Sequence, residues 1–238
     1  MKISLKTSAL LAALAAFAIS ARADSLTLSQ DTANYSVGNG GAFIAAPLNG
    51  PISNADYIGA AKIAGGGFLT FCIEYNEEFS PSNISGYSYN YALNYGSVNG
   101  GQGGQPAATP QYDGISNATA FLYSQFAQGT LTGLAGFDYN LAGYGALQQA
   151  IWYLEGEAPY GTNNSLAQAA IAHEGANWNS DNNGAYGVQA INLTYQNGAN
   201  AQDQLYYHNV PDQGVTVALL GLSLLGLVGF RRKFFGAK

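Results

Sequence analysis

The sequence predicts an α+β protein, in which a β-rich lobe, either a sandwich or a barrel-like sheet, is interrupted by a helical insertion. Residues 24–98 alternate in polarity over short segments that end at Gly-Gly, Asn-Gly and Pro turns. A Gly-, Asn- and Gln-rich linker at 99–112 separates them from residues 113–178, where apolar residues recur at helical spacing. Alternation returns at 186–208, and no internal repeat is visible.

Three strands are expected in the first part, at residues 25–30, 41–45 and 67–75. In the third strand, odd and even positions face opposite ways. The odd face carries Leu69, Phe71, Ile73 and Tyr75, and the even face carries Phe68, Thr70, Cys72 and Glu74. Cys72 is therefore expected to point away from the more apolar face.

Three helices are expected in the insertion, at residues 113–129, 145–155 and 165–173. Asp113 or Ser116 can cap the first helix. The core-facing residues of the first two helices are Ile115, Ala118, Leu122 and Phe126, then Leu147, Ile151 and Leu154. Two strands are expected to follow, at 188–194 and 204–208.

Basic residues are almost absent between the two ends of the chain. Of eight Lys and Arg residues, only Lys62 lies within residues 24–209, against Asp and Glu throughout. This acidic balance argues against binding to nucleic acid or, through a basic patch, to anionic lipid. The abundance of Gly, Asn, Tyr and Gln is typical of a secreted, loop-rich protein.

The N-terminus has the three-part layout of a secretory signal peptide. Lys2 and Lys6 provide the positive start, residues 9–19 form an apolar stretch, and Ala21 and Ala23 are the small residues before a cleavage site. We expect residues 1–23 to be removed by cleavage after Ala23, so that the protein is exported.

The C-terminus has the layout of a sorting tail. Val210-Pro211-Asp212-Gln213-Gly214 precedes an uncharged apolar segment at 215–230, and an Arg-Arg-Lys cluster follows. The segment is long enough for a short membrane span whose basic end stays in the cytoplasm. Residues 210–238 resemble the PEP-CTERM sorting signals, in the branch that reads Val-Pro-Asp-x-Gly. The resemblance implies transient membrane anchoring, an exosortase-type processing enzyme as a partner, and a cell-surface or extracellular destination.

Cys72 is the single cysteine of the chain, so no intramolecular disulfide can form in an oxidising compartment. Four interpretations remain: a buried inert thiol, an intermolecular bridge, a catalytic nucleophile, or a cysteine consumed by another covalent bond.

Two short motifs together resemble a known family. Phe71-Cys72-Ile73 lies on a strand, and Gln148-Gln149-Ala150-Ile151-Trp152 lies on a helix half a domain later. With the acidic segment at 74–78, the helix at 119–126 and the segment at 201–205, they resemble the bacterial thioester domains of surface adhesins across residues 24–209.

The resemblance implies an internal thioester between Cys72 and Gln148, at the interface of the two lobes, with Gln149 as the less favoured partner. It implies a surface-displayed adhesin that binds a macromolecular nucleophile, an amine or a hydroxyl, covalently and without turnover, hence no enzyme, cofactor or metal. An amine would leave an isopeptide cross-link. Helical spacing puts Gln148, Trp152 and Glu155 on one stripe, where Trp152 can shield the bond.

Other functions are open on sequence alone. The main alternative is a non-reactive structural protein of the extracellular matrix or exopolysaccharide layer, with Cys72 buried and inert. A cysteine protease would need His173 or His208 as its base, without a supporting motif. Residues 179–184 imitate the start of an EF-hand, but Ala190 stands where the bidentate Glu is required.

Overall fold

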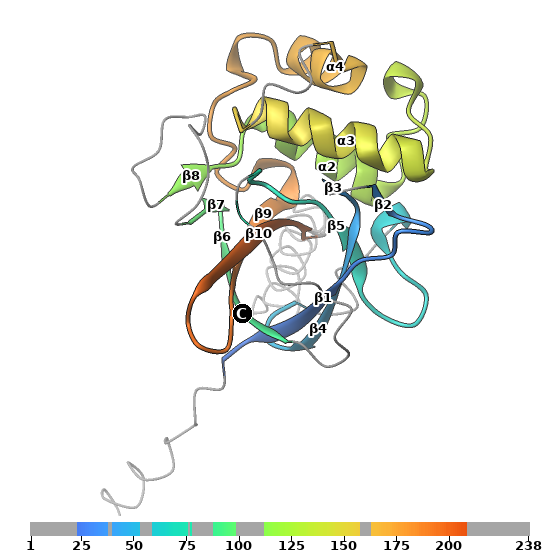
Figure 1. The fold of residues 1–238 in the computed structure, drawn as a ribbon. Helices are drawn as coiled ribbons and strands as arrows, with labels where there is room; N and C mark the ends of the chain where they lie inside the picture. The colour runs from blue at the N-terminus through green and yellow to red at the C-terminus, as the bar shows by residue number, and fades with distance from the viewer. Residues whose placement is uncertain are drawn as a thin grey trace, which may run out of the picture.

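The computed structural model describes residues 23–37, 40–52, 59–75, 77, 88–98, 112–157 and 163–208. The apolar parts of the expected signal peptide and sorting tail lie outside these residues. A six-stranded antiparallel sheet dominates the fold, in the order β10-β9-β6-β1-β4-β5 (Figure 1). Its strands are β1 (Ser25–Ser29), β4 (Phe43–Asn49), β5 (Phe68–Thr70), β6 (Tyr89–Asn94), β9 (Val188–Thr194) and β10 (Asn200–Tyr207).

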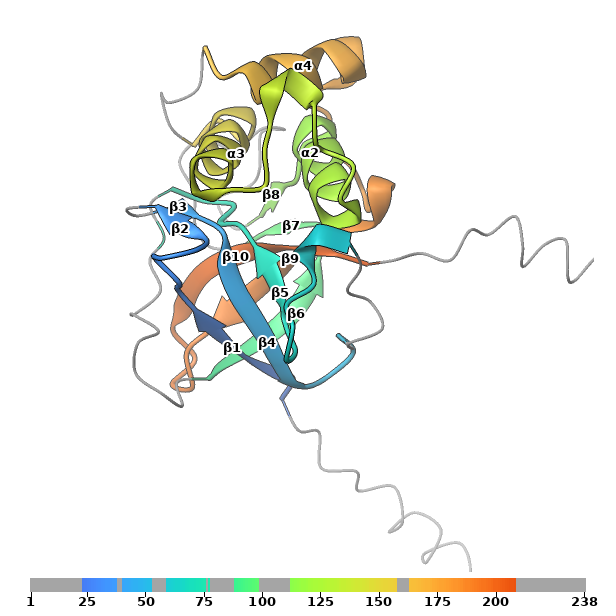
Figure 2. The ribbon, with the colours of Figure 1, turned by 90° about the vertical axis from the view of Figure 1, so that its right-hand side faces the viewer.

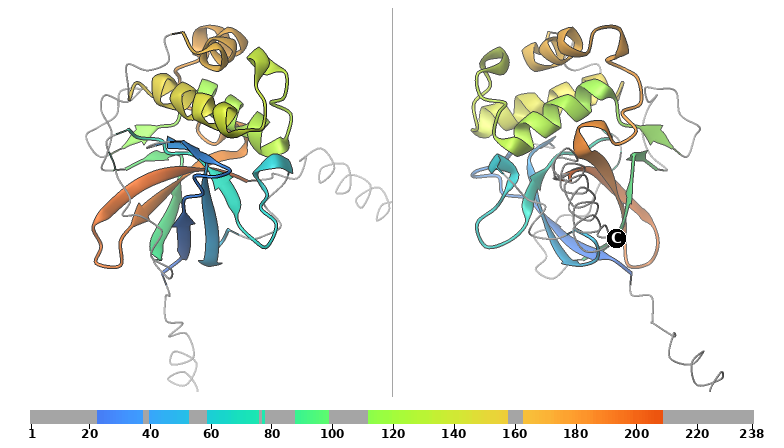
Figure 3. Two further views of the ribbon diagram at one scale, coloured as in Figure 1. Left: turned by 45° about the vertical axis from the view of Figure 1, so that its right-hand side comes forward. Right: turned by 180° about the vertical axis from the view of Figure 1, so that it is seen from behind.

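The two edges of this sheet meet, so the sheet is barrel-like. Beyond β5 the chain leaves β4 and pairs with β10, where the Leu205 amide donates to the Phe71 carbonyl at 3.0 Å. The Ile73 amide donates to the Asp203 carbonyl at 3.1 Å. Figure 3 shows the strongly curved sheet that results. The expected strand at 67–75 is thus a short β5 followed by residues that change partner.

Two small antiparallel pairs accompany the main sheet. They join β2 (Ser36–Val37) to β3 (Gly40–Gly41), and β7 (Gly96–Ser97) to β8 (Asp113–Gly114). Asp113 therefore belongs to a strand, and the expectation that a helix begins there is wrong.

The helices gather over one end of the sheet, with α4 outermost (Figures 1 and 2). They are α2 (Asn117–Gln128), α3 (Leu141–Leu154) and α4 (Ser165–Glu174), with 3-10 turns η1 (Gly59–Ala61), η2 (Leu134–Gly136), η3 (Gly175–Asn177) and η4 (Ala185–Gly187). Ser116 caps α2, since its hydroxyl accepts the Thr119 amide at 3.2 Å. The second helix begins four residues before its expected start because Asn140 caps it.

Two buried clusters meet along β5 and its continuation. Leu69, Phe71 and Ile73 pack against α2 and α3, and the expected core residues of these helices are all fully buried with them. Phe68 and Cys72 belong to the second cluster, with residues of β1, β6 and β10. The alternation of faces is confirmed, but the even face is no less buried than the odd one. Each large apolar side chain so buried stabilises the fold by about 1.5–3 kcal/mol.

Candidate functional site

Cys72 lies where the two sheet edges join. It forms an isolated antiparallel bridge with Gln204 of β10, flanked by the bonds of Phe71 and Ile73 described above. In such a pair, the two facing residues exchange no backbone bonds and their side chains lie close together. The amide and carbonyl of Cys72 therefore point away from β10 and need other partners.

Gln148 of α3 supplies both partners. Its Oε1 accepts the Cys72 amide at 3.0 Å, and its Nε2 donates to the Cys72 carbonyl at 2.8 Å. The carboxamide thus takes the place of a neighbouring strand. Cys72 is fully buried and Gln148 is 1% exposed, whereas Gln149 is exposed. The structure brings Cys72 and Gln148 together across 76 residues of sequence.

Gln204 approaches the sulfur itself. Its Nε2 lies 3.4 Å from the Cys72 Sγ, and its side chain is 1% exposed. Its Oε1 is buried without a hydrogen-bond partner among the described residues. Residues 201–205 are part of the family resemblance, but nothing in the sequence assigns a role to Gln204.

The environment keeps the thiol neutral. Burial raises the pKa of Cys72 from 9.0 to about 12, and the Glu74 charge adds a little, while hydrogen bonds from Gln204 and the backbone oppose the rise. At neutral pH the free cysteine is therefore a protonated thiol, and alkylating reagents would react with it slowly.

Trp152, one turn after Gln148, belongs to the same buried cluster as Cys72 and is 6% exposed. Its ring meets Tyr75 edge to face, with centroids 5.0 Å apart. On the other side, a Cβ added to Gly40 would come within 2.9 Å of both Gln148 Cγ and the Trp152 ring. A small residue at this position of β3 thus lets the chain pass close to both side chains.

Glu155, the third residue of the stripe, has a structural role. It accepts the Ser116 hydroxyl at 2.8 Å and the Ser116 amide at 3.2 Å, so it ties the end of α3 to the start of α2. Burial raises its pKa to about 8, although these hydrogen bonds oppose the rise.

The two histidines are engaged away from the sulfur. His173 of α4 stacks on Phe121 with centroids 3.9 Å apart, and its Nδ1 lies 2.9 Å from a Glu174 carboxylate oxygen. His208 follows β10, where its amide donates to the Gly187 carbonyl and its ring contacts Tyr206. The side-chain contact found at the Cys72 sulfur comes from Gln204.

A cluster of three carboxylates lies next to the cysteine. One oxygen each from Glu74, Glu77 and Asp203 lies within 4.8 Å of the others. Burial, then Glu77 and Asp203, raises the pKa of Glu74 to about 10; burial is also the main cause that raises the pKa of Asp203 to about 8. The sequence does not indicate this cluster, because Asp203 is far along the chain from the two glutamates and meets them only when the sheet closes.

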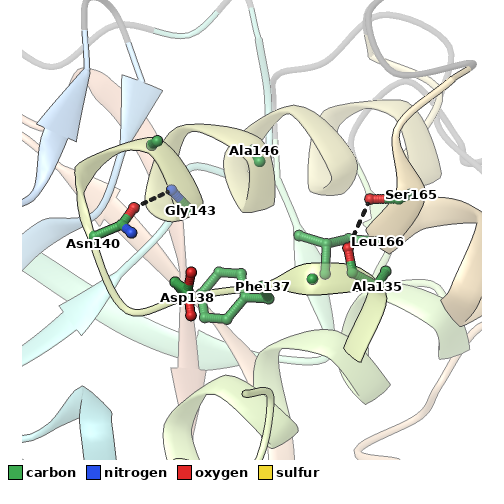
Figure 4. A pocket seen from close by; sticks show the side chains of 10 residues that line it. Ala135, Phe137, Asp138, Asn140, Gly143, Ala146, Ser165 and Leu166 are labelled. Atoms are coloured by element: carbon green, nitrogen blue, oxygen red, sulfur yellow. Dashed lines mark hydrogen bonds between the residues drawn. The ribbon is translucent and has the colours of Figure 1, made fainter. Parts of the chain in front are cut away.

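Two other parts of the structure, a surface pocket and the segment 179–184, are weaker candidates for a functional site. A surface pocket lies between η2 and the starts of α3 and α4 (Figure 4), but its one charged residue is Asp138, and neither Cys72 nor Gln148 lines it. In the segment 179–184 that imitates an EF-hand, Asp181 accepts the Asn183 amide at 2.9 Å and so orders the turn.

Comparison with known proteins identifies the C-terminal end of the chain. Residues 209–234 match the VPDSG-CTERM motif, with Gln213 at the serine position. The chain therefore carries an exosortase-type sorting tail, which implies an exported protein targeted to the cell surface. No curated protein and no solved structure matches the chain. Among the described residues, no helix has the length and apolar character of a membrane span.

Proposed function

We propose that the protein is a surface-displayed adhesin-like domain that forms an internal thioester between Cys72 and Gln148 and uses it to bind a partner covalently. The observation that carries the proposal is the double hydrogen bond between the Gln148 carboxamide and the Cys72 backbone. These bonds fix the carboxamide beside Cys72, whose sulfur is three covalent bonds from the backbone nitrogen that donates to Gln148 Oε1.

Thioester formation needs no external reagent. The Cys72 sulfur attacks the Gln148 Cδ, the Cδ–Nε2 bond breaks, and the thiol proton leaves with the nitrogen as ammonia. The new Sγ–Cδ bond replaces an amide by a more electrophilic acyl group.

The hydrogen bonds around the carboxamide favour this step. The Cys72 amide points at Oε1, where negative charge develops in the tetrahedral intermediate, so it acts as an oxyanion donor. Gln204 donates toward the sulfur and favours its ionised form. Burial of Cys72 and Trp152 keeps water from the product bond.

In the binding step, a nucleophile of the partner attacks the Gln148 acyl carbon. The Sγ–Cδ bond breaks, the proton lost by the nucleophile passes to the Cys72 sulfur, and the partner stays bonded to the Gln148 acyl carbon. We propose a primary amine as the nucleophile, which leaves an isopeptide bond. The near absence of lysine fits this choice, because Lys62 is the single Lys or Arg within 24–209 that could react with a neighbouring copy. Each molecule reacts once, so this is covalent binding without turnover.

Methylamine tests the proposal. The expected result is an adduct on the peptide that contains Gln148 and a newly titratable Cys72, both absent after Cys72→Ala. A protein that gives no adduct and has a free thiol before treatment would contradict it.

The second candidate is a non-reactive structural protein of the extracellular matrix. The buried, protonated thiol of Cys72 and its raised pKa favour this function. The same experiment separates the two, since an inert thiol yields no methylamine adduct.

We also propose that the segment 215–230 anchors the chain in the membrane until an exosortase-type enzyme acts near Val210-Pro211-Asp212-Gln213-Gly214. The support is the VPDSG-CTERM match together with the apolar segment and the basic cluster that follows it. Deletion of residues 215–238 should release the protein into the medium. Membrane retention equal to that of the full chain would overturn the anchor.

A further inference from the structure

Three carboxylates meet beside the proposed thioester without a basic partner. Glu74 is fully buried, Asp203 is 1% exposed, and Glu77 is half-buried. Lys62, the one Lys or Arg within 24–209, is exposed, and the contact between a basic and an acidic side chain found among the described residues joins His173 to Glu174. No described side chain could therefore balance the negative charge of the cluster once it is ionised.

The hydrogen bonds of the cluster are also incomplete. Asp203 is held by the Val98 amide, the Asn192 side chain and the Leu193 amide at 2.7, 2.7 and 3.0 Å. Glu77 and Ser97 lie near enough to the Glu74 carboxyl to shift its pKa, but neither contact has the full geometry of a hydrogen bond, so both Glu74 oxygens lack one among the described residues. Leaving a buried carboxylate ionised without partners costs several kcal/mol, so such a group stays protonated unless it is paired or binds a metal ion.

The hydroxyl oxygen of Ser97 lies beside the same carboxylate cluster. The Ser97 hydroxyl, fully buried at the end of β7, lies beside Glu74 and opposes the rise in the pKa of its carboxyl. This hydroxyl too lacks a hydrogen-bond partner among the described residues. Two unsatisfied, fully buried side chains, one acidic and one neutral, thus converge on the cluster.

We propose that Glu74, Glu77 and Asp203 bind one calcium ion, with Ser97 Oγ as a further oxygen ligand. Oxygen ligands are those that calcium and magnesium prefer. Ligands about 2.3–2.6 Å from a calcium ion can be about 4.6–5.2 Å apart, whereas magnesium holds them within about 4.2 Å. The three oxygens all lie within 4.8 Å of one another, close enough for one calcium ion, which proteins bind through several carboxylates, whereas magnesium usually keeps several waters.

The ion would join the two chain segments that carry the reactive site. Glu74 and Glu77 follow Cys72 closely, and Asp203 precedes Gln204 on β10. Calcium therefore braces the junction where the two sheet edges meet. The site goes beyond the proposed thioester and does not depend on it.

Calcium titration tests the site. The full chain, purified in detergent and stripped with EDTA, is titrated with CaCl2 by calorimetry, and its melting temperature is followed with and without calcium. We expect one ion per chain, a dissociation constant below about 1 mM, the weak end for extracellular calcium modules, and a higher melting temperature. Glu74→Gln and Asp203→Asn should weaken binding at least tenfold.

Three further variants keep the outcome clear. Asp138→Asn, which removes an exposed carboxylate elsewhere, should bind calcium like the wild type. Glu77→Gln changes a half-buried residue and should weaken binding even if the buried variants fail to fold. Cys72→Ala should leave calcium binding unchanged, so failure of the thioester and failure of the calcium site give different results. No saturable binding up to about 10 mM, or tighter binding of MgCl2 than of CaCl2, would overturn the proposal.

Discussion

Gln148 and Gln204 approach Cys72 from opposite sides and hold different parts of it. Gln148 comes from α3 and binds the backbone amide and carbonyl, while Gln204 comes from β10 and binds the sulfur. Both side chains are 1% exposed. The comparison teaches that contact with the sulfur alone does not identify an acyl donor. Gln148 has both ends of its carboxamide fixed, whereas the Gln204 Oε1 has no partner among the described residues.

The largest effect is expected when the proposed acyl donor is removed. Gln148→Ala should abolish the loss of ammonia completely and leave one titratable thiol, because no acyl carbon remains opposite Cys72. Gln149→Ala is the matched control, since that residue is exposed on the same helix, and it should keep the wild-type mass. An ammonia deficit that survives Gln148→Ala and disappears in Gln204→Ala would reverse the assignment.

A methyl group added at Gly40, next to Gln148 and Trp152, should have the next largest effect. In Gly40→Ala, the new Cβ lies 2.9 Å from Gln148 Cγ and 2.9 Å from the Trp152 ring, so both side chains must move. We expect less than half of the protein to carry the thioester, and the remaining bond to hydrolyse faster as Trp152 shifts. Intact mass over time measures both. Wild-type thioester content in this variant would show that the position of Gln148 is not critical.

Loss of the sulfur contact should slow the reaction without preventing it. Gln204→Leu removes a donor to the developing thiolate, and such a bond is worth about 1.5–3 kcal/mol. Thioester formation after folding should therefore slow by about tenfold or more, with the same final ammonia loss. A final yield near zero would mean that Gln204 itself supplies the acyl group.

Glu155→Gln should leave the thioester unaffected and change only the pH dependence of stability. Burial favours protonated Glu155 in the folded protein, with a pKa of about 8 against 4.5 when unfolded. The folded state binds the extra proton, so this residue lowers stability as pH rises from about 4.5 to about 8. The free energy of unfolding, measured with urea at pH 5 and at pH 8, should therefore fall less with pH in the variant than in the wild type. An unchanged slope would contradict the assigned role.

Local features of this site could be predicted from sequence, and long-range ones could not. Helical spacing fixes Gln148 on the buried side of α3 and Gln149 outside, and the cap at Ser116 follows from residue type. The backbone orientation of Cys72 depends on its bridge to Gln204, 132 residues away. The strand at 67–75 was predicted too long because alternation does not reveal a change of strand partner.

The acidic cluster illustrates the same limit. Glu74 and Glu77 look like solvated charges in the sequence, since nothing near them indicates burial. Only closure of the sheet brings Asp203 against them and excludes water. The resemblance to thioester domains pointed to Cys72 and Gln148, which the structure places in contact, but it carried no information about the charges beside them.

The most direct test of the thioester is the intact mass of the exported wild-type protein, measured with thiol titration under denaturing conditions immediately after purification. The account predicts a mass one ammonia below that of the processed sequence and no titratable thiol. Cys72→Ala should instead have its full calculated mass. A wild-type protein with its full sequence mass and one free thiol would contradict the proposed thioester.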